Sequence, residues 1–166
     1  LVQSFYAWLD PDERPELIKS LPFVTVMIWG FVSFIRMIIT ASLTEWALLV
    51  VLYCFGMFLI TGIFHRGVSH KAYKASRMVW GIFFFLGSMV LQKGLLWWAS
   101  WHRHHHKKSD TPDDAHSVFQ KANQARVIGF GPRLSAALGF CWGQWMWICA
   151  KKYDKPRWKE LDDAKC

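Results

Sequence analysis

The longest uncharged stretch of this chain limits its possible folds more than any other feature. Residues 46–64 contain no Asp, Glu, Lys or Arg. A helix rises about 1.5 Å per residue, so this stretch would cover roughly 28 Å, close to the hydrocarbon thickness of a bilayer. We therefore predict a transmembrane helix over these residues.

A second apolar stretch precedes the first. Residues 20–35 carry no charge, Arg36 interrupts, and residues 37–44 are again uncharged. The very short turn around residues 40–44 predicts a helical hairpin whose two outer ends lie on one side of the membrane. Both outer ends are flanked by basic residues, namely Arg14, Lys19, Arg66, Lys71, Lys74 and Arg77. The positive-inside rule places both ends in the cytoplasm.

The composition also fits a membrane protein. The chain of 166 residues has a net charge of +8, is 53% hydrophobic and contains 11 Trp and 13 Phe. Its basic residues flank apolar segments, which indicates contact with anionic lipid or an acidic partner rather than with nucleic acid. We predict an all-α membrane protein with a cytoplasmic leader (1–19), two transmembrane helices (20–64) and a cytoplasmic-side region (65–166).

Five of the seven histidines form two clusters. His65 and His70 have an H-x4-H spacing, and His102, His105 and His106 lie in the run HRHHH. Neutral imidazole is the commonest side-chain metal ligand and suits iron, copper, zinc and nickel. Cysteines and Glu-x-x-His motifs are absent from these segments, which argues against thiolate sites and soluble carboxylate di-iron bundles. The clusters predict a histidine metal site at the edge of a bilayer.

Helix geometry separates ligands from bystanders in the second cluster. At 100° per residue, His102, His105 and His106 lie within about a 100° arc, whereas His104 points away and is expected to be solvated. His65 and His70 lie about 140° apart on an ideal helix. They converge only if the helix ends or bends between them, and Gly67 permits a bend.

The apolar segment 78–101 is broken by Gln92 and Lys93. A transmembrane span here would carry the two histidine clusters to opposite faces of the membrane. If the clusters share a metal, the segment must instead be an interfacial or re-entrant helix on the cytoplasmic side, which we favour. Its tryptophans 97, 98 and 101 fit an interfacial aromatic belt or a substrate channel equally well.

Carboxylates follow the second cluster closely. One of Asp110, Asp113 and Asp114 is expected to accept a hydrogen bond from a ligand imidazole and fix its tautomer, and we select Asp110. His116 is predicted to support the site rather than to bind the metal directly.

Taken together, residues 60–117 resemble the membrane-bound fatty acyl desaturases of the Δ9 acyl-CoA type and their bacterial relatives. The family pattern is H-R-x-x-S-H, a cytoplasmic-side amphipathic helix, H-R-x-H-H, S-D-T and an element like D-P-H-S. Here the matching segments read HRGVSH, HRHHH, SDT and DDAHS, in the same order.

The resemblance implies a di-iron centre that uses O2 to place a cis double bond in a fatty acyl chain. It implies that the metal ligands are His65, His70, His102, His105 and His106, with no further catalytic group. Gln92 and Trp98 match positions that line the bend of the acyl tunnel, and His116 matches the histidine of the D-P-H element. The implied partners are the membrane, an acyl-CoA or acyl-lipid substrate and an external electron donor such as cytochrome b5 or ferredoxin.

The chain also departs from the family pattern. It lacks the third box, H-x2-H-H, and two further spans; Ala115 replaces a proline, and Gln144 stands where a histidine is expected. We therefore expect an incomplete, N-terminal portion of a desaturase that is inactive alone. Two alternatives stay open: a related histidine-box hydroxylase, which the H-x4-H spacing disfavours, and a non-catalytic metal-binding membrane protein.

Overall fold

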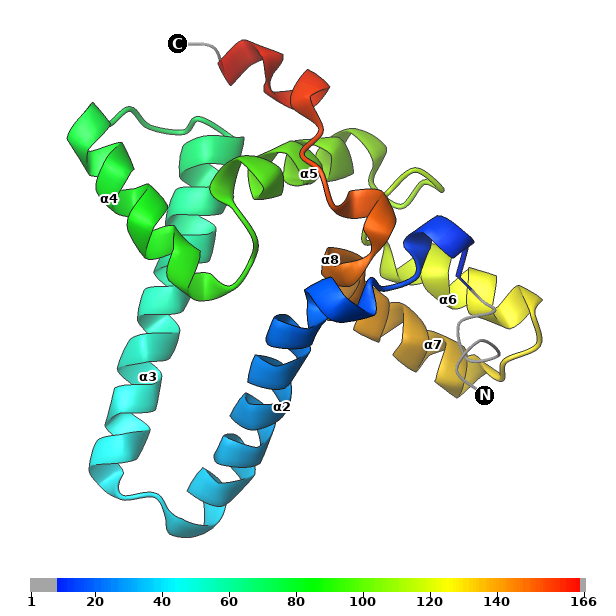
Figure 1. Ribbon diagram of the computed structural model, residues 1–166, viewed down its shortest axis with the longest axis horizontal. Helices are drawn as coiled ribbons and strands as arrows, with labels where there is room; N and C mark the ends of the chain where they lie inside the picture. Colours follow the sequence, from blue (N-terminus) through cyan, green and yellow to red (C-terminus); the bar gives the residue numbers. More distant parts are fainter. Residues whose placement is uncertain (1–8, 165–166) are drawn as a thin grey trace. The chain divides into compact units, whose positions relative to one another are not determined.

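The computed structural model describes residues 9–164 (Figure 1). Helices dominate, and the described residues contain no strand, only an isolated bridge between Pro15 and Ala150. The all-α prediction is confirmed. The chain forms two compact units, which we name the hairpin unit (residues 18–95) and the Trp-rich unit (residues up to 17 together with those from 96 onward).

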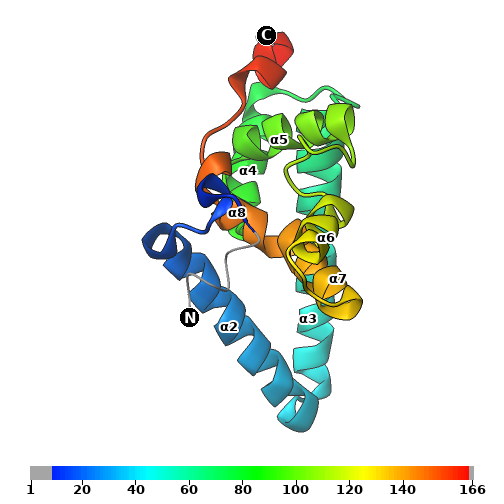
Figure 2. The same cartoon turned by 90° about the vertical axis from the view of Figure 1, so that its right-hand side faces the viewer.

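The hairpin unit begins with two long helices joined by a two-residue turn. Helix α2 covers Leu17–Thr40, α3 covers Leu43–Met57, and the π-helix η2 continues α3 over Phe58–Ser69. A capping box starts α3: the Ser42 backbone N–H donates to the Glu45 carboxylate at 2.7 Å, and the Glu45 N–H donates back to the Ser42 hydroxyl. The predicted short turn is confirmed, and the two arms diverge from it as a V (Figures 1 and 2).

Both arms are long and apolar enough to cross a membrane. The two candidate spans cover Ile18–Thr40 and Leu43–Ser69, with mean hydropathies of 1.9 and 2.5. Large apolar side chains are exposed along both, for example Trp29, Phe31 and Tyr53. Such a surface is unfavourable in water but natural in lipid. The protein is therefore an integral membrane protein.

The third apolar segment is broken. Helix α4 (Arg77–Gly87) and a single 3₁₀ turn, η3 (Ser88–Val90), are followed by Leu91 and Lys93 in the left-handed region, with φ of 55° and 57°. Eleven residues of α-helix cover only about 16 Å, too little to cross the hydrocarbon layer. Helix α4 packs instead on η2, where a Cβ on Gly87 would overlap the ring of buried Phe64.

In the described part of the chain, the Trp-rich unit combines residues 9–17 with residues 96–164. Its elements are η1 (Pro11–Glu13), α5 (Leu95–Lys108), α6 (Val118–Val127), α7 (Pro132–Cys141), the π-turn η4 (Trp142–Met146), α8 (Trp147–Cys149), η5 (Lys151–Tyr153) and η6 (Trp158–Ala164). This unit therefore holds chain from both sides of the hairpin. That residues 78–101 add no third crossing stays a prediction, because α4 and α5 together would also pass as one bent span.

Tryptophans form the core of this unit. Trp97 and Trp101 are buried, each 4% exposed, and donate their indole N–H groups to the carbonyls of Tyr153 (2.6 Å) and Lys155 (3.1 Å). A buried indole needs such an acceptor. An interfacial belt is therefore wrong for these two residues, because the C-terminal segment covers them.

A buried ion cluster attaches the N-terminal segment to this core. The Glu13 carboxylate is paired with Lys121 and with Lys152 (3.1 Å), and it accepts a hydrogen bond from the Tyr153 hydroxyl at 3.0 Å. Burial raises the pKa of Glu13, but the hydrogen bonds and charges of the two lysines outweigh burial and lower it overall. Part of the segment expected to be a simple leader thus belongs to the core.

Helices α6 and α7 pack very closely, side by side in both views (Figures 1 and 2). A Cβ on Gly139 would overlap the Val118 carbonyl and lie 2.9 Å from Ala122. We predict that Gly139→Val forces the helices apart and destabilises the Trp-rich unit by about 1–3 kcal/mol, the usual cost of overpacking. Thermal unfolding in detergent, followed by circular dichroism, measures the effect.

Gly131→Ala is the matched control, since a Cβ at Gly131 meets nothing within 4 Å. Equal melting temperatures for the two variants would show that the close α6–α7 contact does not stabilise the protein.

Candidate metal site

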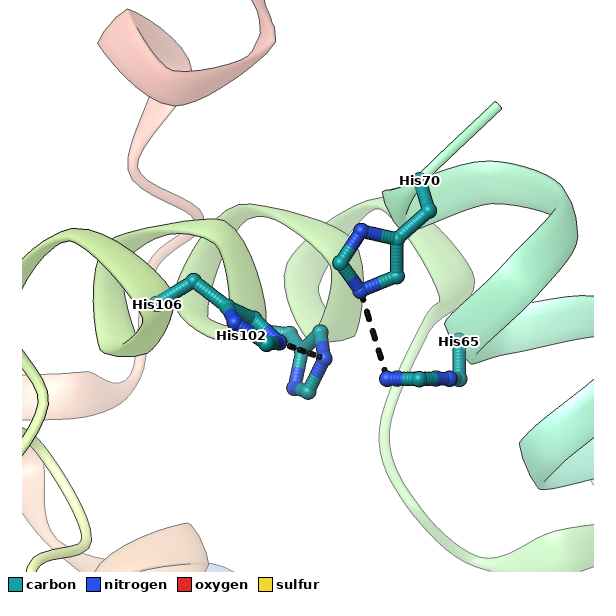
Figure 3. Close-up of side chains that lie close together, drawn as sticks. All are labelled: His65, His70, His102 and His106. Carbon is teal, nitrogen blue, oxygen red and sulfur yellow. Dashed lines mark hydrogen bonds between the residues drawn. The ribbon is translucent and has the colours of Figure 1, made fainter. Parts of the chain in front are cut away.

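The first histidine pair is built by a change in helical winding. In η2 the backbone bonds five residues back, as when the His70 N–H donates to the His65 carbonyl at 3.1 Å. Residues i and i+5 therefore face the same way, and the two Nε2 atoms approach to 3.2 Å (Figure 3). The predicted convergence of the pair is confirmed, but a π-helix produces it rather than a bend at Gly67. Such π-helical segments occur often at functional sites.

Local contacts hold this winding in place. The Ser69 hydroxyl donates to the Phe64 carbonyl at 2.7 Å, and the Tyr73 hydroxyl donates to the Gly62 carbonyl at 2.7 Å. Gly67 has a packing role, because a Cβ there would lie 2.6 Å from the Tyr73 oxygen and 2.9 Å from the Trp80 ring.

The second pair lies on α5, in the Trp-rich unit. His102 and His106 are one helical turn apart, and their Nε2 atoms are 2.9 Å from each other (Figure 3). Two imidazoles that bind one metal through bonds of about 2.1 Å, at angles of about 90–110°, bring their nitrogens to roughly 3.0–3.4 Å. The first pair, at 3.2 Å, has this spacing, and the second pair, at 2.9 Å, lies just below it.

His105 lies on the same helix and is paired with a carboxylate. Its Nδ1 lies 2.9 and 3.0 Å from the two carboxylate oxygens of Asp114. The ionised carboxylate can only accept, so Nδ1 carries the proton and Nε2 is the atom that could bind a metal. This is the arrangement by which carboxylates fix the tautomer of metal-binding histidines.

Asp114, and not the expected Asp110, is the carboxylate that contacts the His105 ring. The Asp114 side chain is buried and also accepts hydrogen bonds from the backbone N–H groups of Asp110 (3.0 Å) and His116 (3.2 Å). Asp110 instead stabilises the turn, where its carboxylate accepts a hydrogen bond from the Ser117 hydroxyl at 2.8 Å. Three aspartates follow the second cluster, and spacing alone does not distinguish them.

The charges of this pair are coupled. The hydrogen bond to Asp114 raises the pKa of His105. Burial raises the pKa of Asp114, but the hydrogen bonds from His105 and from the two backbone N–H groups outweigh it, so that pKa falls below its usual range.

His116 completes this group. Its ring stacks on His105, with centroids 4.1 Å apart, and on Trp147 at 4.9 Å. Burial lowers the pKa of His116 to about 4, so its imidazole is neutral at physiological pH, the form that binds metals. One donor atom each of His105, Asp114 and His116 lies within 4.8 Å of the others. His116 thus has the position of a direct ligand as well as that of a supporting residue.

His104 is not the solvated neighbour that helix geometry predicted. It is 5% exposed, its Nε2 lies 3.0 Å from the Asp113 carbonyl, and its Nδ1 lies 3.5 Å from the Glu160 carboxylate. Residues from the C-terminal segment cover this face of α5, and Arg103 also donates to the Glu160 carbonyl at 2.9 Å. The His104 side chain does point to another side of α5 than His102 and His106, but that side is covered by protein and not by solvent.

The two expected channel residues occupy distinct settings. Gln92 is half-buried between the left-handed residues Leu91 and Lys93. Trp98 stacks on His102, with centroids 4.4 Å apart. Their role in a substrate channel stays a prediction, as does a single site shared by the two histidine pairs.

The donor set fits iron. It consists of imidazoles with a carboxylate that orients one of them, and the cysteines of the described residues, Cys54, Cys141 and Cys149, lie outside it. Apolar spanning helices with clustered imidazoles define a histidine-rich integral membrane protein. Comparison with known proteins identifies its family.

The chain is similar to several fatty acid desaturases. It is 32% identical over 132 residues to Delta(9)-fatty-acid desaturase fat-7 of Caenorhabditis elegans. The matched region makes up 70% of this chain and 39% of the relative. It is 26% identical over 167 residues to sn-1 stearoyl-lipid 9-desaturase of Synechocystis sp., covering 96% and 46%. It is 37% identical over 73 residues to Acyl-CoA C20 Delta5-desaturase of Anemone leveillei, covering 40% and 23%.

These similarities place the chain in the fatty acid desaturase family. The chain spans less than half the length of these relatives. No protein-family model matches it, and no solved structure matches it significantly.

The role of Asp114 predicts a change in the titration of His105. Asp114→Asn removes the charged acceptor, so the pKa of His105 should fall toward its ordinary value. Nuclear magnetic resonance of labelled histidines measures this pKa. Asp113→Asn is the control, because that carboxylate is 71% exposed and lies 3.8 Å from Lys108. A similar fall in both variants would contradict a specific Asp114–His105 pair.

Proposed function

We propose that the protein containing this chain is a membrane-bound fatty acyl desaturase. It inserts a cis double bond, at the Δ9 position, into an acyl-CoA or acyl-lipid substrate in an O2-dependent reaction. The proposal rests on two pairs of imidazoles whose Nε2 atoms are 3.2 and 2.9 Å apart, in a chain whose sequence is similar to desaturases. Two of the relatives are named as acting at position 9, one of them on a stearoyl lipid.

The imidazoles would hold two iron ions. His65, His70, His102, His105 and His106 would be the ligands, with His116 beside His105. Bound iron would supply the oxidation of the saturated acyl chain by O2. The protein's own contribution is to position its ligands, since Asp114 orients His105 and the stack of His116 on Trp147 limits the movement of both rings.

The residues around the histidines would exclude water and position the substrate. Buried Trp97, Trp142 and Trp147 keep water from the side of the unit that lies behind His116. Gln92 and Trp98 would line the acyl channel and position the chain, since regiochemistry depends on placing one C–H bond near the oxidant. The basic flanks of the spans favour a cytoplasmic site, which a separate electron donor such as cytochrome b5 or ferredoxin would reach.

The proposed activity is tested on the protein at the length its gene encodes, expressed in a yeast strain without its own desaturase. We predict a product with a cis double bond at carbon 9, identified by mass spectrometry. The variants His105→Ala and His106→Ala should lose both this product and the bound iron. A hydroxylated product instead would identify the hydroxylase alternative.

His104 gives a matched comparison within the same helix. His104→Ala should keep iron loading per folded molecule but lower stability by about 1–3 kcal/mol, because it leaves buried polar partners unsatisfied. Metal analysis of the folded fraction and thermal unfolding separate the two effects. Loss of iron from the folded His104 variant equal to that of His106→Ala would show that the ligand assignment is wrong.

A double-mutant cycle tests whether the two pairs share one site. Two irons of a shared centre lie a few Å apart, so an imidazole from each pair should lie within about 10 Å of the other. His70→Ala and His106→Ala should then weaken iron binding by amounts that are not additive. Competition titration with a chelator measures the affinities. Strictly additive effects would show that each pair binds metal independently.

A further inference from the structure

The α6–α7 hairpin of the Trp-rich unit has an apolar outer face. On α7, the exposed residues include Leu134 and Phe140, 51% and 52% exposed, with Ala136 and Ala137 between them. At the end of α6, Val127 is 86% exposed. This face is unfavourable in water, and it lies outside the histidine site.

The face belongs to a well-packed element and not to a loose end. Behind it, Ser135, Leu138 and Gly139 are buried against α6 and the tryptophan core. The Ser135 hydroxyl also donates to the Phe130 carbonyl at 3.1 Å, which fixes the turn between the helices. A helix pair with one buried and one exposed apolar side needs a second apolar surface to cover it.

The charges around this face indicate what covers it. Residues 115–153 contain no Asp or Glu. Of the basic residues in that stretch, Lys121 is buried beside Glu13, whereas Arg126 and Arg133 are exposed on the hairpin. An apolar face that carries the exposed cations Arg126 and Arg133, on a segment without Asp or Glu, complements a bilayer surface with anionic lipids.

The connectivity of the chain supports the same occupant. The Trp-rich unit continues directly into α2 at residues 17 and 18, without a linker. It is therefore tethered to the membrane by the spans themselves. We propose that the outer face of the α6–α7 hairpin lies in the headgroup region of an anionic bilayer, with Leu134, Ala137 and Phe140 inserted. This contact needs neither iron nor catalysis.

Spin-label accessibility tests the proposal on the full chain in nanodiscs that contain phosphatidylglycerol. The four native cysteines are replaced by alanine, and a nitroxide is attached through Ala137→Cys or, as control, through Lys159→Cys on exposed η6. We expect the label at position 137 to collide several-fold more with oxygen than with a water-soluble nickel complex. The label at position 159 should show the reverse. A label at 137 that is as accessible to nickel as the control would overturn the proposal.

Two further arms separate lipid from other occupants. Arg126→Gln combined with Arg133→Gln should reduce the oxygen preference at position 137 in anionic discs and change it little in discs of phosphatidylcholine alone. A label shielded from both oxygen and nickel, to an extent that depends on the number of chains per disc, would show that a second copy covers the face and would also overturn the proposal.

Discussion

A hydrocarbon layer offers no hydrogen-bond partners, so every backbone group inside it must be satisfied within its own helix. Helices α2 and α3 meet this requirement with regular winding. Where α3 continues as η2, the winding widens. The hydroxyls of Ser69 and Tyr73 then donate hydrogen bonds to the carbonyls of Phe64 and Gly62. The first histidine pair lies at the far end of this π-helix, with His65 inside it and His70 directly after it. The spacing of the two rings follows from the wider winding.

The sequence predicts those features that follow from local pattern. Uncharged runs define the two spans, and the polar turn between them has the capping residues that a helix start requires. The convergence of His65 and His70 was also predictable, although its cause was not, because no composition rule distinguishes a π-helix from a bend. The spacing of His102 and His106 follows directly from one helical turn.

Features that depend on distant chain could not be predicted in this way. His104 was expected in solvent because its covering residue, Glu160, follows it by more than fifty positions. The burial of Trp97 and Trp101 has the same origin, since their acceptors lie near residue 154. Choosing Asp114 over Asp110 needs the turn that brings one carboxylate under His105. Sequence spacing reduces the number of candidate residues, but only the three-dimensional packing shows which of them is buried or contacts the histidine.

The buried carboxylate of Glu13 has a consequence for how the protein is made. Its partners Lys121 and Tyr153 follow it by 108 and 140 residues, with both spans between them. A ribosome therefore releases Glu13 first, then delivers the hairpin to the membrane, and only much later releases the residues that enclose this carboxylate. The Trp-rich unit thus cannot complete its core until Tyr153 has been synthesised, after both spans.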